Sequence, residues 1–215
     1  MPYTEQYTRE DFARITWGEY GQTLDSLFGK VYKYVRESGT KIDAVVPLLR
    51  GGNFPGTFLA FKLKMLRIVP MQYKYFFKDG KVQLRKILGF PEYVSFNHKP
   101  TFLLVENNHC FGQASQTAAK DLKEKFSDSK ILYAADHMDF SYQKNNYADE
   151  IFYGKLTNET RTLDKLEAKK LGLSSDIHLF PWEEYDEEAT KVQGKQYEYE
   201  NMEEVIRNSE EKKLI

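Results

Sequence analysis

Residues 42–49 (IDAVVPLL) limit the possible folds of this chain more than any other segment. They form an almost continuous apolar run rich in β-branched residues, which is typical of a strand covered on both faces. The glycines Gly51 and Gly52 follow at once, and Pro55 then marks the start of a helix. The unit therefore reads as strand, glycine turn and helix, although Pro47 lacks the amide hydrogen that a central strand uses.

The same alternation of strand and helix patterns recurs along the chain. Helical spacing of apolar residues predicts a first helix between Thr16, a capping residue, and Gly39, and another over residues 115–126. Apolar runs predict strands at 68–77, 101–106, 130–135 and 177–180, a turn at 107–112, and a long mobile loop at 78–100. This order predicts an α/β fold, with a parallel sheet flanked by helices and ligands at the carboxyl ends of the strands. We expect one domain over residues 1–183, with a small irregular hood built from both chain ends, and a charged tail or helix over 184–215.

Composition and charge exclude several classes of partner. Apolar residues make up 41% of the chain, and 31 basic residues balance 32 acidic ones, so we expect neither nucleic acid nor an anionic membrane as partner. The single cysteine, Cys110, cannot form an internal disulfide, and the amino-terminal residues lack the apolar core of a signal peptide. No apolar run approaches the roughly 20 residues that cross a bilayer. These features predict a soluble, cytoplasmic protein with a small-molecule ligand.

The turn at residues 50–52 carries the first chemical signal. Gly51 and Gly52 allow backbone amides to approach an anion, the following helix adds its positive end, and Arg50 adds a charged fork. This combination predicts a phosphate site. The alternative is a tight strand-to-helix turn with a surface arginine.

Three segments resemble motifs of the type I phosphoribosyltransferases, especially the purine (xanthine-guanine and hypoxanthine) branch. They are ITWGEY at 15–20, VVPLLRGGNFPG at 45–56 and FPWE at 180–183. The resemblance implies the phosphoribosyltransferase fold, binding of phosphoribosyl pyrophosphate or a nucleotide monophosphate, and transfer of phosphoribose to a purine-type base. It also implies Mg²⁺ as cofactor, a homodimer, a pyrophosphate site at Arg50, Gly51 and Gly52, and a cis peptide between Leu49 and Arg50.

The segment ENNHCFGQA at 106–114 departs from the family's pattern. Where the family has an acidic pair for the ribose hydroxyls and the metal, this chain has Glu106, the expected metal ligand, and the neutral Asn107. Cys110 replaces the aspartate often assigned as proton acceptor, so the resemblance places the catalytic positions at Glu106, Asn107 and Cys110. Both phosphate-binding threonines are replaced. The phosphate would then bind the backbone at the start of the following helix, at Phe111, Gly112, Gln113, Ala114 and Ser115. The Thr117 hydroxyl would be a further donor.

These departures leave alternatives open. The chain is either a transferase or a catalytically silent descendant that acts as a nucleotide-binding or protein-interaction module. Trp182 either stacks on a purine or packs in the core. The cations of the 78–99 loop either close over pyrophosphate or are solvated charges: Lys78, Lys81, Arg85 and Lys86. Lys144 and Lys155 are candidates, by their place in the chain alone, for the lysine that reads the base in this family. The adjacent His109 and Cys110 do not make a zinc site.

Overall fold

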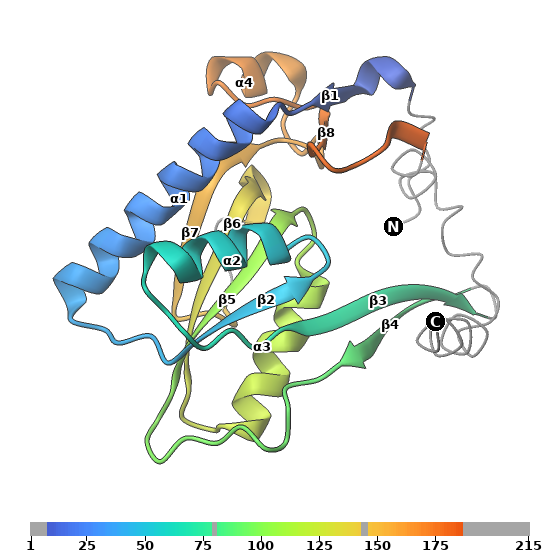
Figure 1. The fold of residues 1–215 in the computed structure, drawn as a ribbon. Helices are drawn as coiled ribbons and strands as arrows, with labels where there is room; N and C mark the ends of the chain where they lie inside the picture. Colours follow the sequence, from blue (N-terminus) through green and yellow to red (C-terminus); the bar gives the residue numbers. More distant parts are fainter. Residues whose placement is uncertain (1–7, 79–80, 143–145, 187–215) are drawn as a thin grey trace, which may run out of the picture.

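A computed structural model describes residues 8–78, 81–142 and 146–186, without the side chains of residues 76–78 and 81–82. Its centre is a six-stranded sheet with the order β4-β3-β2-β5-β6-β7, parallel except for the antiparallel β3–β4 pair (Figure 1). The strands are β2 (Ala44–Leu49), β3 (Met71–Lys78), β4 (Lys81–Leu88), β5 (Thr101–His109), β6 (Lys130–Asp139) and β7 (Glu150–Thr157).

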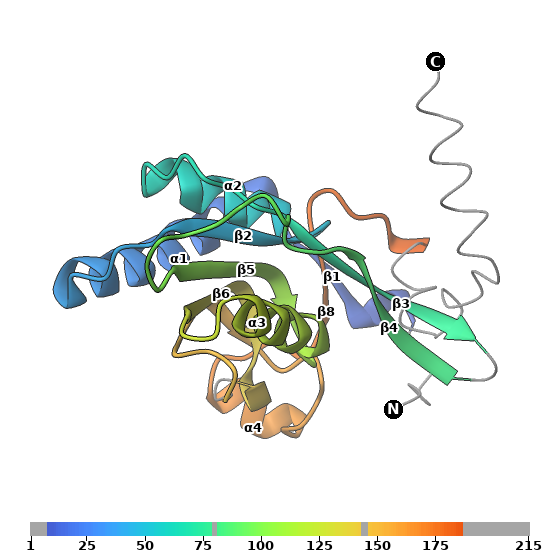
Figure 2. The ribbon, with the colours of Figure 1, turned by 90° about the horizontal axis from the view of Figure 1, so that it is seen from below.

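Helices cover both faces of this sheet, as Figure 2 shows. The helices α1 (Trp17–Ser38) and α2 (Asn53–Lys62) lie on one face, and α3 (Gln113–Lys125) lies on the other. Each face has its own apolar core: Val45, Leu103 and Leu132 belong to the core under α1 and α2, whereas Leu104 and Ile131 belong to the core under α3. The predicted α/β architecture is confirmed.

The first helix begins and ends where the sequence predicts. The Thr16 hydroxyl accepts the Glu19 amide at 3.2 Å, and the Glu19 carboxylate accepts the Thr16 amide at 2.8 Å. Gly39 ends the helix in the left-handed conformation with φ of 67°. Such reciprocal capping satisfies amides that have no partner inside the helix.

Pro47 lies in β2, the strand between β3 and β5, opposite Val105. Val45, two residues earlier, directs both its amide and its carbonyl to the Arg67–Val69 side, through bonds of 3.0 and 2.9 Å. The backbone groups of Pro47 point to the same side as those of Val45, because these directions repeat every second residue along a strand. Its missing amide therefore falls on the side where the β2–β3 pairing is short, and the ladder with β5 is kept.

The two ends of the described chain meet in a small hood. The strands β1 (Phe12–Arg14) and β8 (Ile177–Leu179) pair in parallel, next to the 3-10 helix η1 (Arg9–Asp11) and the short helix α4 (Lys165–Lys170). This is the hood expected from the sequence. Most of the predicted tail, residues 187–215, lies outside the described residues, so the division of the chain at 183 stays a prediction.

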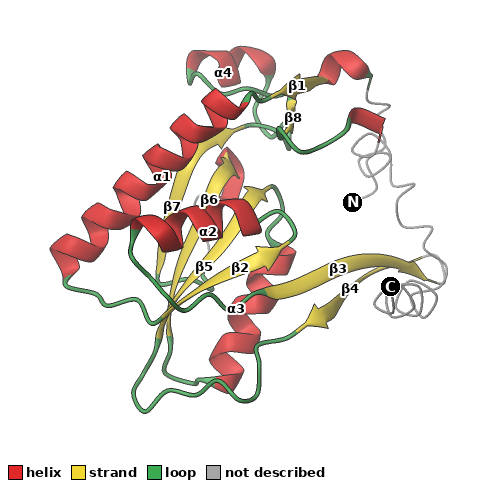
Figure 3. Cartoon of the chain, in the orientation of Figure 1, coloured by secondary structure: helices red, strands yellow, loops and turns green. Residues whose placement is uncertain are grey.

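Two local predictions are wrong. Residues 81–88 form β4, which pairs with β3, rather than part of a mobile loop (Figure 3). The segment KVQLRKIL has little periodicity of its own, and pairing with β3 makes it a strand. The predicted turn at 107–112 is also too long, because β5 continues to His109 through pairs such as Asn108 with His137.

No helix in the described ranges is both long enough and apolar enough to span a bilayer.

Candidate functional site

The turn after β2 is a narrow backbone loop in which the Leu49–Arg50 peptide bond is cis, as expected from the sequence. The Gly52 amide donates to the Leu48 carbonyl at 2.8 Å. A Cβ atom at Gly52 would lie 2.7 Å from the Leu48 carbonyl oxygen and would overlap the Val105 carbonyl, so a larger residue does not fit. Arg50 is exposed, and its side chain makes no hydrogen bond or ion pair with any described residue, which leaves its guanidinium available to a ligand.

The end of β5 lies directly against this turn. A Cβ atom at Gly51 would overlap the side-chain oxygen of Asn107, which is 9% exposed. The two segments that the sequence analysis singled out, 50–52 and 106–107, are therefore brought together. The Asn107 side chain packs against the backbone of the glycine turn at Gly51.

Glu106 is half-buried at the same end of the sheet. Burial raises the pKa of its carboxyl to about 8, and the charge of Asp136 adds to this, while the Asn107 amide and the Lys74 ammonium act in the opposite direction. Without a bound cation, Glu106 therefore keeps its proton to a higher pH than an ordinary glutamate, and the protonated form donates a hydrogen bond as well as accepting one. A bound cation would favour the carboxylate.

The start of α3 supplies backbone amides. Gly112, at the N-cap, has φ of 66°, and a Cβ atom there would overlap the His109 ring. The expected hydroxyl donors already have partners: Ser115 donates to the Gly112 carbonyl at 2.9 Å, and Thr117 donates to the Gln113 carbonyl at 2.8 Å. An anion at this helix start would thus rely on main-chain amides, including those of Gln113 and Ala114, and on the helix dipole. Phe111, just before it, is 44% exposed.

Cys110 lies between the strand end and the hood. Its thiol donates to Glu159 Oε2 at 3.2 Å, and burial raises the pKa of the thiol well above its ordinary value, with the Glu159 charge as a further cause. The group is therefore a thiol and not a thiolate.

Trp182 joins the hood to α2. Its ring stacks on Phe54 with centroids 4.1 Å apart, on Phe180 at 5.3 Å, and meets Tyr20 edge-on at 4.9 Å. Aromatic packing of this kind stabilises the contact between hood and helix. A purine at this position would have to extend or replace the stack.

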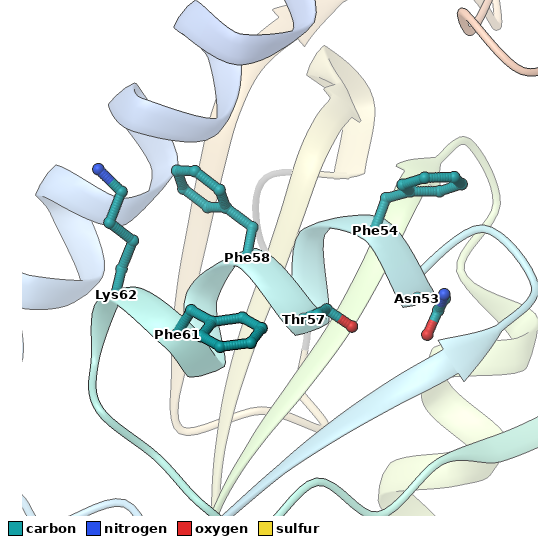
Figure 4. A pocket seen from close by; sticks show the side chains of 6 residues that line it. All are labelled: Asn53, Phe54, Thr57, Phe58, Phe61 and Lys62. Atoms are coloured by element: carbon teal, nitrogen blue, oxygen red, sulfur yellow. The ribbon is translucent and has the colours of Figure 1, made fainter.

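The outward face of α2 carries further aromatic side chains. Figure 4 shows Phe54, Phe58 and Phe61 along one helix, with Lys62 beside them, around a hollow of about 460 Å³. Phe61 is 79% exposed. This hollow is formed by α2 alone and lies apart from the end of β5.

Two of the remaining predicted cations that the structure describes lie on other strands, away from the glycine turn. Lys86 on β4 forms an ion pair with Asp121 of α3 at 2.6 Å, and Lys155 lies on β7, three strands away from β2. The side chains of Lys78 and Lys81, as well as Lys144, lie outside the described residues.

The sequence analysis missed a buried polar cluster between the sheet and the hood. The Tyr20 hydroxyl donates to Asp136 Oδ2 at 2.6 Å, and the other Asp136 oxygen contacts His137 Nδ1 at 2.8 Å. Glu159 contacts His178 Nδ1 and accepts from Asn108 at 2.8 Å. One signal was available: Asp136 follows an apolar strand, at the end where ligands of parallel sheets bind.

Comparison of the structure with solved structures decides the fold. A purine phosphoribosyltransferase from Pyrococcus horikoshii matches with a TM-score of 0.59 at 16% identity, over 81% of this chain and 95% of the other. A xanthine-guanine-hypoxanthine phosphoribosyltransferase from Helicobacter pylori matches with a TM-score of 0.56 at 15% identity, over 84% and 98%. The chain has the purine phosphoribosyltransferase fold.

A third structure, a hypothetical protein from Neisseria gonorrhoeae with bound ppGpp, matches with a TM-score of 0.62 at 17% identity, over 85% of this chain and 96% of the other. Neither the family models nor the curated proteins give a match by sequence. The phosphoribosyltransferase fold is thus shared at identities where the sequences themselves have diverged.

Proposed function

We propose that this protein binds phosphoribosyl pyrophosphate or a nucleoside 5'-monophosphate at the carboxyl ends of β2 and β5, and transfers phosphoribose to a purine-type base. The observation that carries the proposal is the contact between Gly51 and Asn107, which places the turn that contains Arg50 against the strand that contains Glu106. The uncapped start of α3 adds main-chain amides for a phosphate.

The transfer requires charge stabilisation at two places. Displacing pyrophosphate from ribose builds positive charge on the sugar and negative charge on the leaving group. Arg50 would neutralise the leaving pyrophosphate, and the turn amides would orient it. Glu106 and Asn107 would hold the ribose hydroxyls through hydrogen bonds.

Mg²⁺ fits this site as an ion that binds together with the pyrophosphate group of the substrate. Mg²⁺ is commonly held by one or two carboxylates together with substrate phosphates and water. Glu106 is a carboxyl in the right place, while Asn107 offers a neutral amide oxygen, and the described residues contain no cluster of three or more His, Cys, Asp or Glu side chains suited to a metal. We therefore expect Glu106 to contribute a single ligand, with most of the coordination coming from pyrophosphate and water. Bound Mg²⁺ would neutralise the pyrophosphate charge.

Calorimetric titration tests the proposal. Phosphoribosyl pyrophosphate and guanosine monophosphate are each titrated with and without Mg²⁺, and guanine nucleotides come first because a protein of the same fold was solved with ppGpp. Arg50→Ala should weaken binding of the pyrophosphate by about 10- to 100-fold, because a charged hydrogen bond is worth roughly 1.5–3 kcal/mol. Arg36→Ala, at an exposed position near the end of α1, is the matched control and should leave binding unchanged.

Binding and turnover have separate readouts. Release of pyrophosphate that depends on an added purine base would support transfer. Binding without such release would instead favour the catalytically silent alternative, and unchanged binding in Arg50→Ala would refute the assigned site.

We also propose a homodimer in a cytoplasmic setting. The support for the dimer is the aromatic face of α2, where Phe54 is 40% and Phe61 is 79% exposed, since large exposed apolar patches mark interaction surfaces. Sedimentation of the wild type and of Phe61→Asp tests it, because a charge on that face should shift a dimer to monomer. The single cysteine agrees with a reducing compartment.

A further inference from the structure

A second hollow, of about 480 Å³, lies away from the glycine turn, between α1, β7 and the hood. Figure 1 shows α1 starting beside the hood strands β1 and β8. Five elements contribute polar groups to its lining: Arg14 from β1, Glu19 from α1, Lys155 from β7, and the two histidines His137 of β6 and His178 of β8. The function proposed above uses none of them.

Each of the two histidines is held by a buried carboxylate through the same ring atom. His137 Nδ1 contacts Asp136 Oδ1 at 2.8 Å, and His178 Nδ1 contacts Glu159 Oε1. His137 is 1% and His178 is 5% exposed. No described residue forms a hydrogen bond with Nε2 of either ring. When the ring proton lies on Nδ1, the lone pair of Nε2 is free to bind a ligand.

This arrangement is the one that proteins use to present histidine to a metal ion. A metal-bound histidine usually donates its other ring N–H to a carboxylate, which fixes the orientation of the ring and raises its basicity as a ligand. Here two such carboxylate–histidine pairs lie side by side on adjoining elements and line one hollow.

The spacing of the rings also suits a shared ion. The ring centroids of His137 and His178 are 5.2 Å apart. Two imidazoles on one tetrahedral ion, with metal–nitrogen bonds of about 2.0–2.1 Å, have centroids roughly 5 Å apart. No backbone movement is needed to bring the two rings to this separation.

The charges around the hollow are compatible with a cation. Glu159, which contacts His178 Nδ1, also accepts hydrogen bonds from Asn108 at 2.8 Å and from the Cys110 thiol at 3.2 Å. Of the two cations at the rim, Arg14 is directed to the Glu183 carbonyl at 3.1 Å, and Lys155 is exposed.

We propose that His137 and His178 bind one divalent transition-metal ion, with Zn²⁺ as the representative, through their Nε2 atoms, while water or a small ligand fills the remaining positions. Imidazole is a preferred ligand of Zn²⁺, whereas Mg²⁺ prefers oxygen. The site is therefore separate from Glu106 in both place and chemistry, and its test does not depend on the function proposed above.

Zinc binding is measured directly on the full chain by competition with a chromophoric chelator. We expect one Zn²⁺ per chain, and an affinity at least about tenfold lower in His137→Ala and in His178→Ala, since even outer partners of a metal ligand change affinity by about 10- to 100-fold. The matched control is His98→Ala, at a half-exposed histidine that contacts Asp43 at 2.9 Å, which should bind Zn²⁺ like the wild type. Equal loss in His98→Ala, or loss on Cys110→Ser with binding kept in both histidine variants, would overturn the proposal.

A second measurement avoids substitution of buried residues. All four histidines lie in the described part of the chain, so ¹⁵N NMR of the imidazole rings in the wild type can report on each one. Addition of one equivalent of Zn²⁺ should shift the Nε2 signals of His137 and His178 and leave those of His98 and His109 in place. Shifts at His98 or His109 instead, or no shift at all, would refute the site.

Discussion

Replacing Gly51 by alanine tests the contact on which the candidate site depends. The three atoms nearest to the added Cβ all belong to the Asn107 side chain, with Nδ2 at 3.0 Å and the other two closer still. Overpacking of this kind costs about 1–3 kcal/mol of unfolding free energy. Since the obstacle is a single side chain, Asn107→Ala in the same molecule should remove most of that cost. We therefore expect a coupling energy of about 1–2 kcal/mol between the two changes.

Urea unfolding of the wild type, the two single variants and the double variant measures this coupling. Gly29→Ala is the control: an added Cβ meets nothing within 4 Å in the middle of α1, so this change should stabilise the protein by about 0.5–1 kcal/mol. Additive effects of Gly51→Ala and Asn107→Ala, within roughly 0.5 kcal/mol, would refute the placement of the turn against β5.

Three further predictions concern the surroundings of the site. Gly112→Ala should lower the unfolding free energy by at least about 1 kcal/mol in urea, because φ is 66° there and the new Cβ would overlap the His109 ring; an unchanged midpoint would contradict this. Tyr20→Phe removes the donor to Asp136 and should cost about 1–3 kcal/mol by thermal unfolding, whereas a neutral result would show that the buried carboxyl finds another partner. Burial lowers the pKa of His109 to about 4 from 6.5, so the unfolded state takes up a proton first as the pH falls. Stability should therefore decrease between pH 7 and 4 by up to about 3 kcal/mol through this group, and urea titrations should show a weaker decrease in His109→Gln; identical pH profiles would refute the assignment.

Local patterns were sufficient for much of the fold. The Thr16 and Glu19 cap, the stop at Gly39 and the strand–turn–helix unit around Gly51 and Gly52 were all predicted, because each depends on residues close together in the chain. The parallel sheet followed from the alternation of strands and helices, since crossover connections leave few other arrangements. The sequence also placed ligand-binding candidates at the carboxyl ends of β2 and β5, where the structure finds Arg50 and Glu106.

Tertiary structure decided the features that depend on partners far away in sequence. The segment 81–88 became a strand because β3 pairs with it, and β5 reached His109 because β6 continues beside it. By itself the sequence determined which residues can make a helix, a strand or a tight turn. Only the folded chain determined that the Asn107 side chain packs against Gly51, and that Asp136 and Glu159 each contact Nδ1 of a buried histidine. The physical reason is that hydrogen bonding within a segment is local, whereas burial and charge pairing arise when distant segments exclude water together.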